Sequence, residues 1–359
     1  MKKGYLVLEN GAVFEGELTN DEGEAFGEVV FNTSMTGYQE IVSDPSYAGQ
    51  IIVFCYPQIG NYGLNELDSE SEGLYLHGVV TGEQCDIPSH YLSKNSFSNG
   101  LEEKKIPSLT GVDTRAIVKL LRGHGTMKGK ITSQAPNEIE EDWTYDNVFV
   151  PFVSTKETKH YPADGPHVIL MDYGYKKSIL TSLLDLGCCV TVIPYNTSYE
   201  SITALKPDGI VLSNGPGDPK DLSDQFQTIK KISEQYPTFG ICLGHQLLAL
   251  SHGAQTRKLL FGHRGSNHPV KHTETGKVYI TSQNHGYEVV SESLEKTNFT
   301  VSFTNINDET VEGLKHNKLS IQSVQFHPEA HAGPSDTAFL FNSFLQQISQ
   351  TGEHHYAFT

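Results

Sequence analysis

The chain has 359 residues, of which 37% are hydrophobic, and this length and composition predict two domains, each with its own core. The formal net charge of −17 argues against nucleic-acid binding, because phosphate contacts require clustered Lys and Arg. No apolar run of about 18 residues is present, and the first residues lead into β-type sequence without a signal-type segment. We therefore expect no membrane partner and a cytoplasmic protein. The five cysteines include no CxxC pair, which favours free thiols in a reducing compartment.

Residues 1–150 are expected to form a β-rich α/β domain with few helices. Two extended runs joined at Asn10-Gly11 are typical of a β-hairpin. A helix is predicted between the candidate N-cap Asp113 and a stop signal at Gly123. Residues 151–166 are polar and contain prolines near both ends, so we expect a linker there.

Residues 167–350 are expected to form a second α/β domain, followed by a short tail at residues 351–359. Short apolar runs alternate with helical segments in this part, and such βαβ patterns predict a parallel sheet. Apolar strands precede both Ser213 and Cys242. The loops that follow them should therefore meet at the carboxyl ends of the strands, where such folds place their binding sites.

Cys242 follows a β-prone stretch, is flanked by Gly240 and Gly244, and precedes an apolar helical pattern. This order predicts a strand, a sharp turn and a helix, a layout that presents a nucleophile at the turn. The N-terminus of the helix favours negative charge and therefore the thiolate form. We interpret Cys242 as a catalytic thiolate, against the alternative of a buried, inert cysteine.

A histidine and a carboxylate, His327 and Glu329, follow an apolar strand far downstream of Cys242. His327 is a candidate base for the thiol, and Glu329 is a candidate partner that orients the imidazole, as in a catalytic triad. A surface carboxylate at an ordinary strand end is one alternative. A metal site that adds His331 is another, but Pro328 disturbs the ladder and no HExxH motif is present, so we expect no metal there.

A glycine-proline turn at residues 213–219 follows another apolar strand. Hydrolysis of an amide requires N–H donors directed at the developing oxyanion, and a glycine-rich loop allows the backbone to approach a ligand closely. Gly215 is our candidate for one donor, and Leu243, directly after Cys242, is the candidate for the other. An ordinary loop between a strand and a helix is the alternative.

Three of these segments together resemble the class I, triad-type glutamine amidotransferases, and they read GICLGHQ at 240–246, SNGPGDP at 213–219 and QFHPE at 325–329. The segment TSQNHGY at 281–287 is similar to the substrate-side loop of carbamoyl-phosphate synthase small subunits. Motifs of the front half resemble the amino-terminal domain of that subunit and lie at 31–40, 44–47 and 111–115.

The resemblance implies an α/β fold in which a C-terminal parallel-sheet class I amidotransferase domain follows a β-rich N-terminal α/β domain. It also implies that Cys242 is the nucleophile, His327 the base and Glu329 its partner. The residues that correspond to the glutamine contacts of the family are Ser46, Gly215, Gly217, Leu243, Gln246, Asn284, Gly286 and Tyr287.

Local structure is the alternative explanation for several of these contact residues. Ser46 is also suited to a turn after Pro45, and Gln246 to a solvated position on a helix. Asn284 and Gly286 are typical of a hairpin turn. The residues alone do not decide between these interpretations.

The resemblance further implies that L-glutamine is hydrolysed and that ammonia passes to a separate large carbamoyl-phosphate synthase subunit, which uses bicarbonate and ATP. No cofactor or metal is expected in this chain, whereas ATP and Mg²⁺ are expected on the large subunit. The carbamoyl phosphate would serve arginine or pyrimidine synthesis. A subunit of another synthase, a free γ-glutamyl hydrolase and a non-catalytic binding protein are the alternatives.

Overall fold

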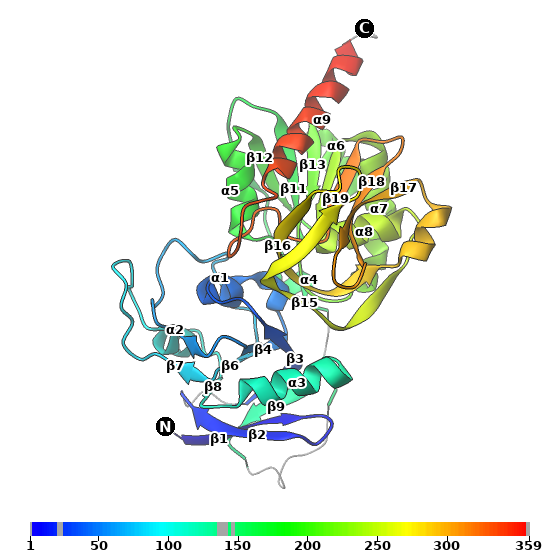
Figure 1. Cartoon of the computed structure of the whole chain (residues 1–359). Coiled ribbons are helices and arrows are strands. Elements are labelled where there is room, and N and C mark those ends of the chain that lie inside the picture. The colour runs from blue at the N-terminus through cyan, green and yellow to red at the C-terminus, as the bar shows by residue number, and fades with distance from the viewer. Residues whose placement is uncertain (1, 20–23, 135–142, 145–147, 357–359) are drawn as a thin grey trace. The chain divides into compact units, whose positions relative to one another are not determined.

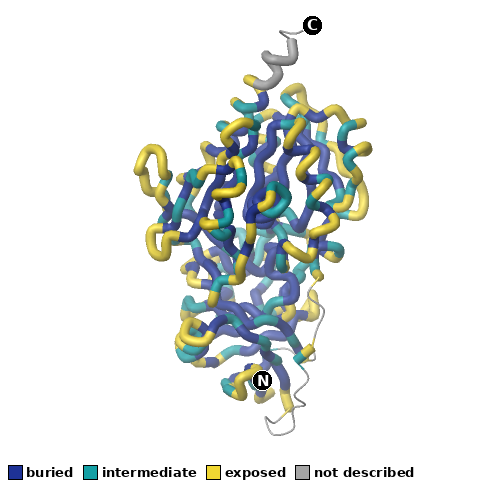
Figure 2. Tube along the Cα trace, turned by 90° about the vertical axis from the view of Figure 1, so that its right-hand side faces the viewer, coloured by how far each residue is buried: buried dark blue, intermediate teal, exposed yellow. Residues whose placement is uncertain are grey.

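The computed structural model describes residues 2–19, 24–134, 143–144 and 148–356 (Figure 1). The chain forms two compact units, each with a buried interior (Figure 2). Unit 1 comprises Met1–Asn147 and Leu259–Gly265, and unit 2 comprises Val148–Lys258 and Ser266–Thr359.

Unit 1 contains a closed barrel with the strand order β1-β2-β8-β6-β4-β3-β9. The predicted hairpin is present, because β1 and β2 pair in antiparallel fashion on either side of Gly11, which has a φ of 84°. The predicted helix is α3, where the Asp113 side chain accepts a hydrogen bond from the N–H of Ala116 at 2.9 Å. The predicted stop at Gly123 is wrong, because the helix continues to His124 and its C-cap is Gly125, with a φ of 97°. The elements of unit 1 are β1 (Lys2–Leu8), β2 (Val13–Leu18), β3 (Ala25–Asn32), α1 (Tyr38–Ser43), η1 (Pro45–Tyr47), β4 (Gln50–Phe54), β5 (Gln58–Ile59), β6 (Gly78–Val80), β7 (Glu83–Gln84), α2 (Phe97–Glu103), β8 (Ser108–Thr110), α3 (Thr114–His124) and β9 (Met127–Thr132).

The 10-stranded sheet has the order β10-β12-β11-β13-β14-β19-β18-β16-β15-β17 and gives unit 2 its framework. Strands β12, β11, β13, β14 and β19 pair in parallel, which confirms the predicted parallel sheet. The remaining elements are α4 (Val150–Val153), β10 (Lys159–Tyr161), β11 (His167–Asp172), α5 (Lys177–Asp185), β12 (Cys189–Pro194), α6 (Tyr199–Ala204), β13 (Gly209–Leu212), η3 (Pro219–Gln225), α7 (Phe226–Gln235), β14 (Thr238–Ile241), α8 (Leu243–Ser251), β15 (Thr256–His272), β16 (Val278–Val289), η4 (Ser291–Lys296), β17 (Phe299–Asn305), β18 (Val311–His316), β19 (Ile321–Val324) and α9 (Phe339–Tyr356).

Strand β11 is buried on both faces, as expected for the centre of a parallel sheet. Ile169 and Met171 pack into the cluster that contains residues of α6, α7 and α8, whereas Val168 and Leu170 pack into the cluster of α5 and α9. Successive side chains of a strand point to opposite faces, so one strand contributes to two layers of core. Full burial of each such side chain contributes about 1.5–3 kcal/mol.

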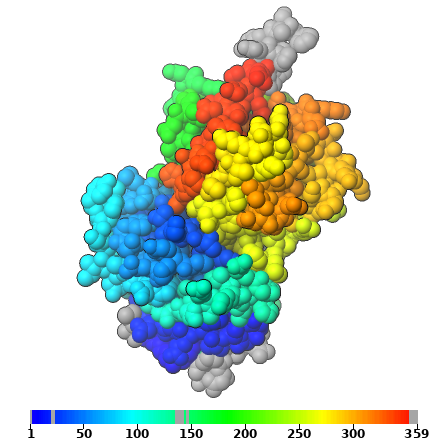
Figure 3. Space-filling view, in the orientation of Figure 1, coloured from blue at the N-terminus to red at the C-terminus, as the bar shows by residue number. Residues whose placement is uncertain are grey.

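Two segments differ from the expected domain plan. The stretch 151–166, expected as a linker, belongs to unit 2 and contains β10, which pairs with β12 at an edge of the sheet. Helix α9 continues to Tyr356, through most of the expected tail. In the space-filling view, α9 (red) lies at the surface of unit 2 beside the green and yellow parts of the chain (Figure 3). No helix in the described ranges combines the length and the hydropathy needed to cross a bilayer.

Candidate active site

Cys242 lies at the turn between β14 and α8, so the predicted strand, turn and helix are present. Its φ of 53° and ψ of −104° lie outside the regions that residues with a Cβ usually adopt. The Cys242 N–H donates to Val324 O at 2.8 Å, and the Sγ donates to Asn284 O at 3.6 Å. These contacts hold the thiol between β19 and β16, at the N-terminus of a nine-residue helix.

The glycines around Cys242 allow a very close approach of α8 to the sheet. A Cβ on Gly244 would collide with the main-chain oxygen of Leu212 on β13, and a Cβ on Gly240 would lie 2.7 Å from Gly244 O. The Gly244 N–H also donates to Ser213 O at 3.0 Å. Larger residues would push the helix outward, so these glycines fix the position of Cys242 relative to the loop after β13.

His327 follows β19 and is held by two contacts. Its N–H donates to Ser282 O at 2.9 Å, and its Nδ1 lies 2.6 Å from Glu329 Oε1. Lys176 Nζ lies 3.2 Å from the same Glu329 oxygen. All three side chains are buried, so His327, Glu329 and Lys176 form a connected charged group in the interior.

The charges of this buried group shift the pKa values of its members. Burial by itself disfavours the charged form of His327, but the charge of Glu329, the nearby thiol of Cys242 and the hydrogen bond to Glu329 raise the pKa of His327 above its ordinary value. Burial would raise the pKa of Glu329, but the charges of Lys176 and His327 lower it well below its ordinary value. The geometry therefore favours a carboxylate at Glu329 and an imidazolium at His327.

The second ring nitrogen of His327 is positioned for proton transfer. His327 Nε2 is buried and has no hydrogen-bond partner among the described groups, although Cys242 is close enough to raise the pKa of the ring. Glu329 holds Nδ1, which fixes the orientation of the imidazole. An imidazolium oriented in this way stabilises a thiolate and donates a proton to a leaving group.

The two candidate oxyanion donors lie in the loop after β13 and at the first residue of α8. A Cβ on Gly215 would lie 2.8 Å from Leu243 Cδ2 and would collide with Tyr173 O, so the loop after β13 packs directly on the start of α8. In the described parts of the chain, neither the Gly215 N–H nor the Leu243 N–H donates a hydrogen bond. Both are therefore suited to an external oxygen atom.

Four of the other predicted glutamine contacts lie on β16 and α8. Asn284, Gly286 and Tyr287 lie within β16 and not in a hairpin turn. Gln246 is buried, and its Nε2 donates to Tyr287 O at 3.0 Å and to Gln325 Oε1 at 2.9 Å, so the solvated helix position considered above is wrong. These bonds connect α8, β16 and the segment after β19.

Two further predicted glutamine contacts, Gly217 and Ser46, lie outside α8, β16 and the segment after β19. Gly217, with a φ of 93°, lies in the loop between β13 and η3. Ser46 lies in η1 of unit 1, where its N–H donates to Asp44 Oδ1 at 2.9 Å. The assignment of Ser46 to the glutamine site stays a prediction.

Sequence reasoning missed two buried residues of the site. Lys176 Nζ donates to Ala330 O at 2.7 Å and to His331 O at 2.6 Å in addition to its contact with Glu329. His245 Nδ1 lies 2.9 Å from Ser323 Oγ, and burial lowers the pKa of His245 to about 3, which keeps the ring neutral. The available signal for Lys176 was its place just after a buried strand of the parallel sheet.

The alternative of a metal at His327, Glu329 and His331 is not favoured by this geometry. Glu329 Oε1 already contacts both His327 Nδ1 and the Lys176 ammonium, and the ammonium charge opposes a bound cation. The groups of potential metal ligands within the described residues do not include this trio.

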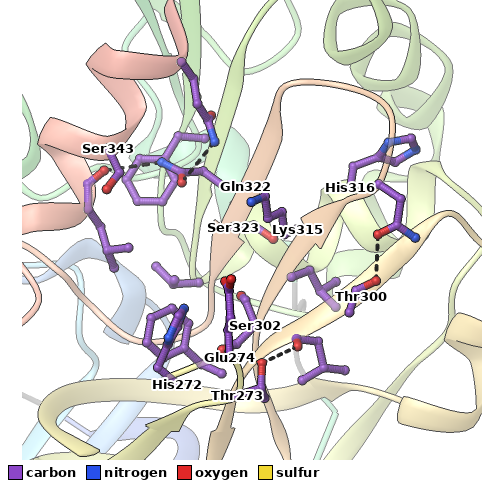
Figure 4. A pocket seen from close by; sticks show the side chains of 18 of the residues that line it. His272, Thr273, Glu274, Thr300, Ser302, Lys315, His316, Gln322, Ser323 and Ser343 are labelled. Carbon is purple, nitrogen blue, oxygen red and sulfur yellow. Dashed lines mark hydrogen bonds between the residues drawn. The ribbon is translucent and has the colours of Figure 1, made fainter. Parts of the chain in front are cut away.

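A cavity of about 920 Å³ lies elsewhere in unit 2, between the β15–β16 hairpin, β17–β19 and α9 (Figure 4). Its labelled lining residues include His272 and Glu274 at the hairpin, Lys315 on β18, Gln322 on β19 and Ser343 on α9. No member of the Cys242–His327–Glu329 group lines it. The cavity is therefore separate from the candidate active site.

Comparisons with known proteins match both halves of the chain. The family described as "Glutamine amidotransferase class-I" matches residues 169–347, which contain Cys242, His327 and Glu329. The family described as "Carbamoyl-phosphate synthase small chain, CPSase domain" matches residues 6–131.

Several curated proteins are similar over nearly the full length. The arginine-specific carbamoyl phosphate synthase small chain of Halalkalibacterium halodurans is 49% identical over 98% of this chain and 98% of its own. The carbamoyl phosphate synthase small chain of Listeria monocytogenes is 48% identical over 99% of this chain and 100% of its own. The pyrimidine-specific small chain of Halalkalibacterium halodurans is 48% identical over 98% of both chains.

Proposed function

Because the chain belongs to the family of carbamoyl phosphate synthase small chains, we propose that it hydrolyses L-glutamine at Cys242 and delivers the ammonia to a large synthetase subunit. One observation carries the site assignment. Glu329 Oε1 lies 2.6 Å from Nδ1 of the buried His327 ring, and the other ring nitrogen, Nε2, has no hydrogen-bond partner in the described structure. This arrangement supports acyl transfer by a thiol, because it supplies both an orienting carboxylate and a positioned acid.

In the first half-reaction, the Cys242 thiolate attacks the side-chain carbonyl carbon of glutamine. The N–H groups of Gly215 and Leu243 stabilise the tetrahedral oxyanion. The C–N bond then breaks, and the His327 imidazolium gives its proton to the departing nitrogen, so that ammonia leaves and a γ-glutamyl thioester remains on Cys242. Glu329 stabilises the imidazolium before this transfer and keeps its orientation.

In the second half-reaction, neutral His327 removes a proton from a water molecule, which attacks the thioester carbonyl. The C–S bond breaks, glutamate is released and Cys242 returns to the thiolate, while His327 is again protonated. The same two N–H donors serve the second tetrahedral intermediate. Ser46, Gly217, Gln246, Asn284, Gly286 and Tyr287 are the proposed contacts that hold glutamine in place.

The proposed partner is the large subunit that combines ammonia with bicarbonate and ATP, and ATP and Mg²⁺ would bind to that subunit. The product, carbamoyl phosphate, would serve arginine or pyrimidine synthesis, and relatives named for either pathway are about equally similar to this chain. All five cysteines are free, which fits a reducing compartment, and we place the protein in the cytoplasm.

The test is the release of glutamate from glutamine by the purified chain, alone and with a large subunit, ATP, Mg²⁺ and bicarbonate. Cys242→Ala should abolish release, whereas the control Cys85→Ala, in unit 1, should leave it unchanged. Carbamoyl phosphate should appear only in the complete mixture, and the partner should accelerate release of glutamate.

Each contrary outcome removes a different part of the proposal. Release that depends on Cys242 but ignores the partner would overturn the coupling and point to another synthase or a free hydrolase. Release that survives Cys242→Ala would overturn the site itself.

A further inference from the structure

Three strands at one edge of the large sheet bring two histidines and a cysteine together. His160 on β10 is the register partner of Thr191 on β12, and His167 on β11 is the register partner of Cys189 on β12. Cys189 and Thr191 are two residues apart on one strand, so their side chains lie on the same face. The pairing therefore places the side chains of His160, His167, Cys189 and Thr191 on one face of the sheet.

The potential ligand atoms of this group are close to one another. One ring nitrogen from each histidine and the Cys189 Sγ all lie within 4.8 Å of one another. The Cys189 Sγ and His160 Nε2 are 4.0 Å apart. Around a tetrahedral zinc ion, with bonds of about 2.0–2.3 Å, ligand atoms are about 3.3–3.6 Å apart. A modest rotation of the side chains would therefore bring the three ligand atoms to coordination distance.

The surroundings of the group suit metal ligands. The hydroxyl of the buried Thr191 lies 3.0 Å from His160 Nδ1 and 2.7 Å from His167 Nε2. A hydroxyl that holds Nδ1 of His160 leaves the opposite nitrogen, Nε2, facing Cys189, and histidine ligands of metals are commonly oriented in this way. His160 is exposed, and His167 and Cys189 are partly exposed, so an ion can reach them.

We propose that His160, His167 and Cys189 form a binding site for a borderline transition-metal ion, with zinc as the best match. Two imidazoles and a thiolate are ligands of this class, and a fourth, tetrahedral position stays open to water or an external ligand. The neighbouring Cys188 does not compete, because its side chain is fully buried in the core on the other face of the sheet. Binding releases the thiol proton of Cys189 to the solvent.

The site is distinct from the candidate active site. His167 and Cys189 are the first residues of β11 and β12, whereas Cys242 follows the last residue of β14. In a parallel sheet these are opposite ends of the strands. A metal bound at the edge formed by β10 and β12 thus contacts no member of the Cys242–His327–Glu329 group.

A cobalt titration of the full chain tests the proposal. Co²⁺ substitutes for Zn²⁺ and gives a near-ultraviolet thiolate-to-cobalt charge-transfer band together with visible bands of tetrahedral cobalt. The titration uses the Cys242→Ser background, so that the active-site thiol cannot produce the band. We expect a band that saturates at one Co²⁺ per chain and disappears when Zn²⁺ is added.

Variants assign the signal to its ligands. Cys189→Ser should abolish the charge-transfer band, and His160→Ala should weaken cobalt binding at least tenfold. Thr191→Val, which removes only the orienting hydroxyl, should weaken it by about 10–100-fold. The matched control Cys85→Ser should keep the band, and circular dichroism should show that each variant is folded.

Two results would overturn the proposal. One is the absence of any charge-transfer band at millimolar Co²⁺. The other is a band that persists in the folded Cys189→Ser variant, since the thiolate ligand would then lie elsewhere.

Discussion

The Lys176 ammonium lies 3.2 Å from Glu329 Oε1, and both side chains are almost completely buried. The same ammonium donates to the main-chain oxygens of Ala330 and His331. Glu329 in turn contacts His327 Nδ1 at 2.6 Å. Lys176 therefore acts on His327 through Glu329, and it positions the segment that carries both.

Replacement of this lysine tests its positioning role. Lys176→Met leaves the buried Glu329 carboxylate without the positive charge of the ammonium. Loss of one partner of a buried ion pair typically lowers the free energy of unfolding by about 3–5 kcal/mol. The lost positive charge also raises the pKa of Glu329, so the acid limb of the glutaminase pH profile should move to higher pH. Urea unfolding and the pH profile check both effects.

The neighbouring lysine provides the matched control for this experiment. Lys177 is exposed at the start of α5, and Lys177→Met should change neither the unfolding midpoint nor the acid limb. A Lys176→Met variant whose acid limb stays in place would show that the ammonium does not act on Glu329.

The raised pKa of His327 predicts a pH-dependent contribution to stability. A folded-state pKa above the unfolded value of 6.5 stabilises the fold at low pH, and this contribution is lost as pH rises through the raised value. We compare Cys242→Ala with Cys242→Ala/His327→Gln, so that the thiol does not titrate. The stability advantage of the first protein should fall between pH 6 and pH 10, because the charge of Glu329 still raises the pKa of His327 when Cys242 is absent. An advantage that is constant or grows over this range would contradict the ion pair.

The sequence predicted the parts of the fold that depend on local pattern. The hairpin at Asn10-Gly11, the helix after Asp113 and the elbow at Cys242 each rest on turn, cap or periodicity signals within a few neighbouring residues. The parallel sheet followed from buried strands that alternate with helices. Such signals do not depend on how distant segments meet.

Features that depend on distant segments were not predictable in this way. Lys176 meets Ala330 across 154 positions of sequence, and no local pattern marks that pairing. The edge strand β10 has the sequence Lys159-His160-Tyr161, and its polarity favoured the prediction of a linker. Edge strands tolerate polar residues, so polarity alone does not separate the two. Gln246 was placed in solvent by its polarity, whereas hydrogen bonds to two distant segments allow it to be buried.

The buried amide of Gln246 gives a third prediction. Gln246→Leu removes the donor to Gln325 Oε1, and a buried acceptor that loses its donor costs about 1–3 kcal/mol. It also removes one contact of Tyr287 O, which keeps its contact with His285 Nδ1 at 2.8 Å. The variant should unfold at lower urea concentration and lose rigidity between α8 and β16. The control Gln227→Leu replaces an exposed residue of α7 and should change the midpoint little. Equal midpoints for the two variants would show that the Gln246 bonds do not stabilise the fold.

The loop that carries Gly215 gives the last prediction. In Gly215→Ala the new methyl group would lie 2.8 Å from Leu243 Cδ2 and would collide with Tyr173 O, and because the second atom belongs to the main chain the loop must shift. The shift moves the Gly215 N–H away from the oxyanion, and loss of one such donor lowers kcat by about 10²–10³-fold. Gly123→Ala, whose methyl group would meet nothing within 4 Å, is the matched control and should keep full activity. Glutaminase kinetics of the two variants check the assignment, and a Gly215→Ala enzyme that keeps its kcat while only its stability falls would place the oxyanion donor outside this loop.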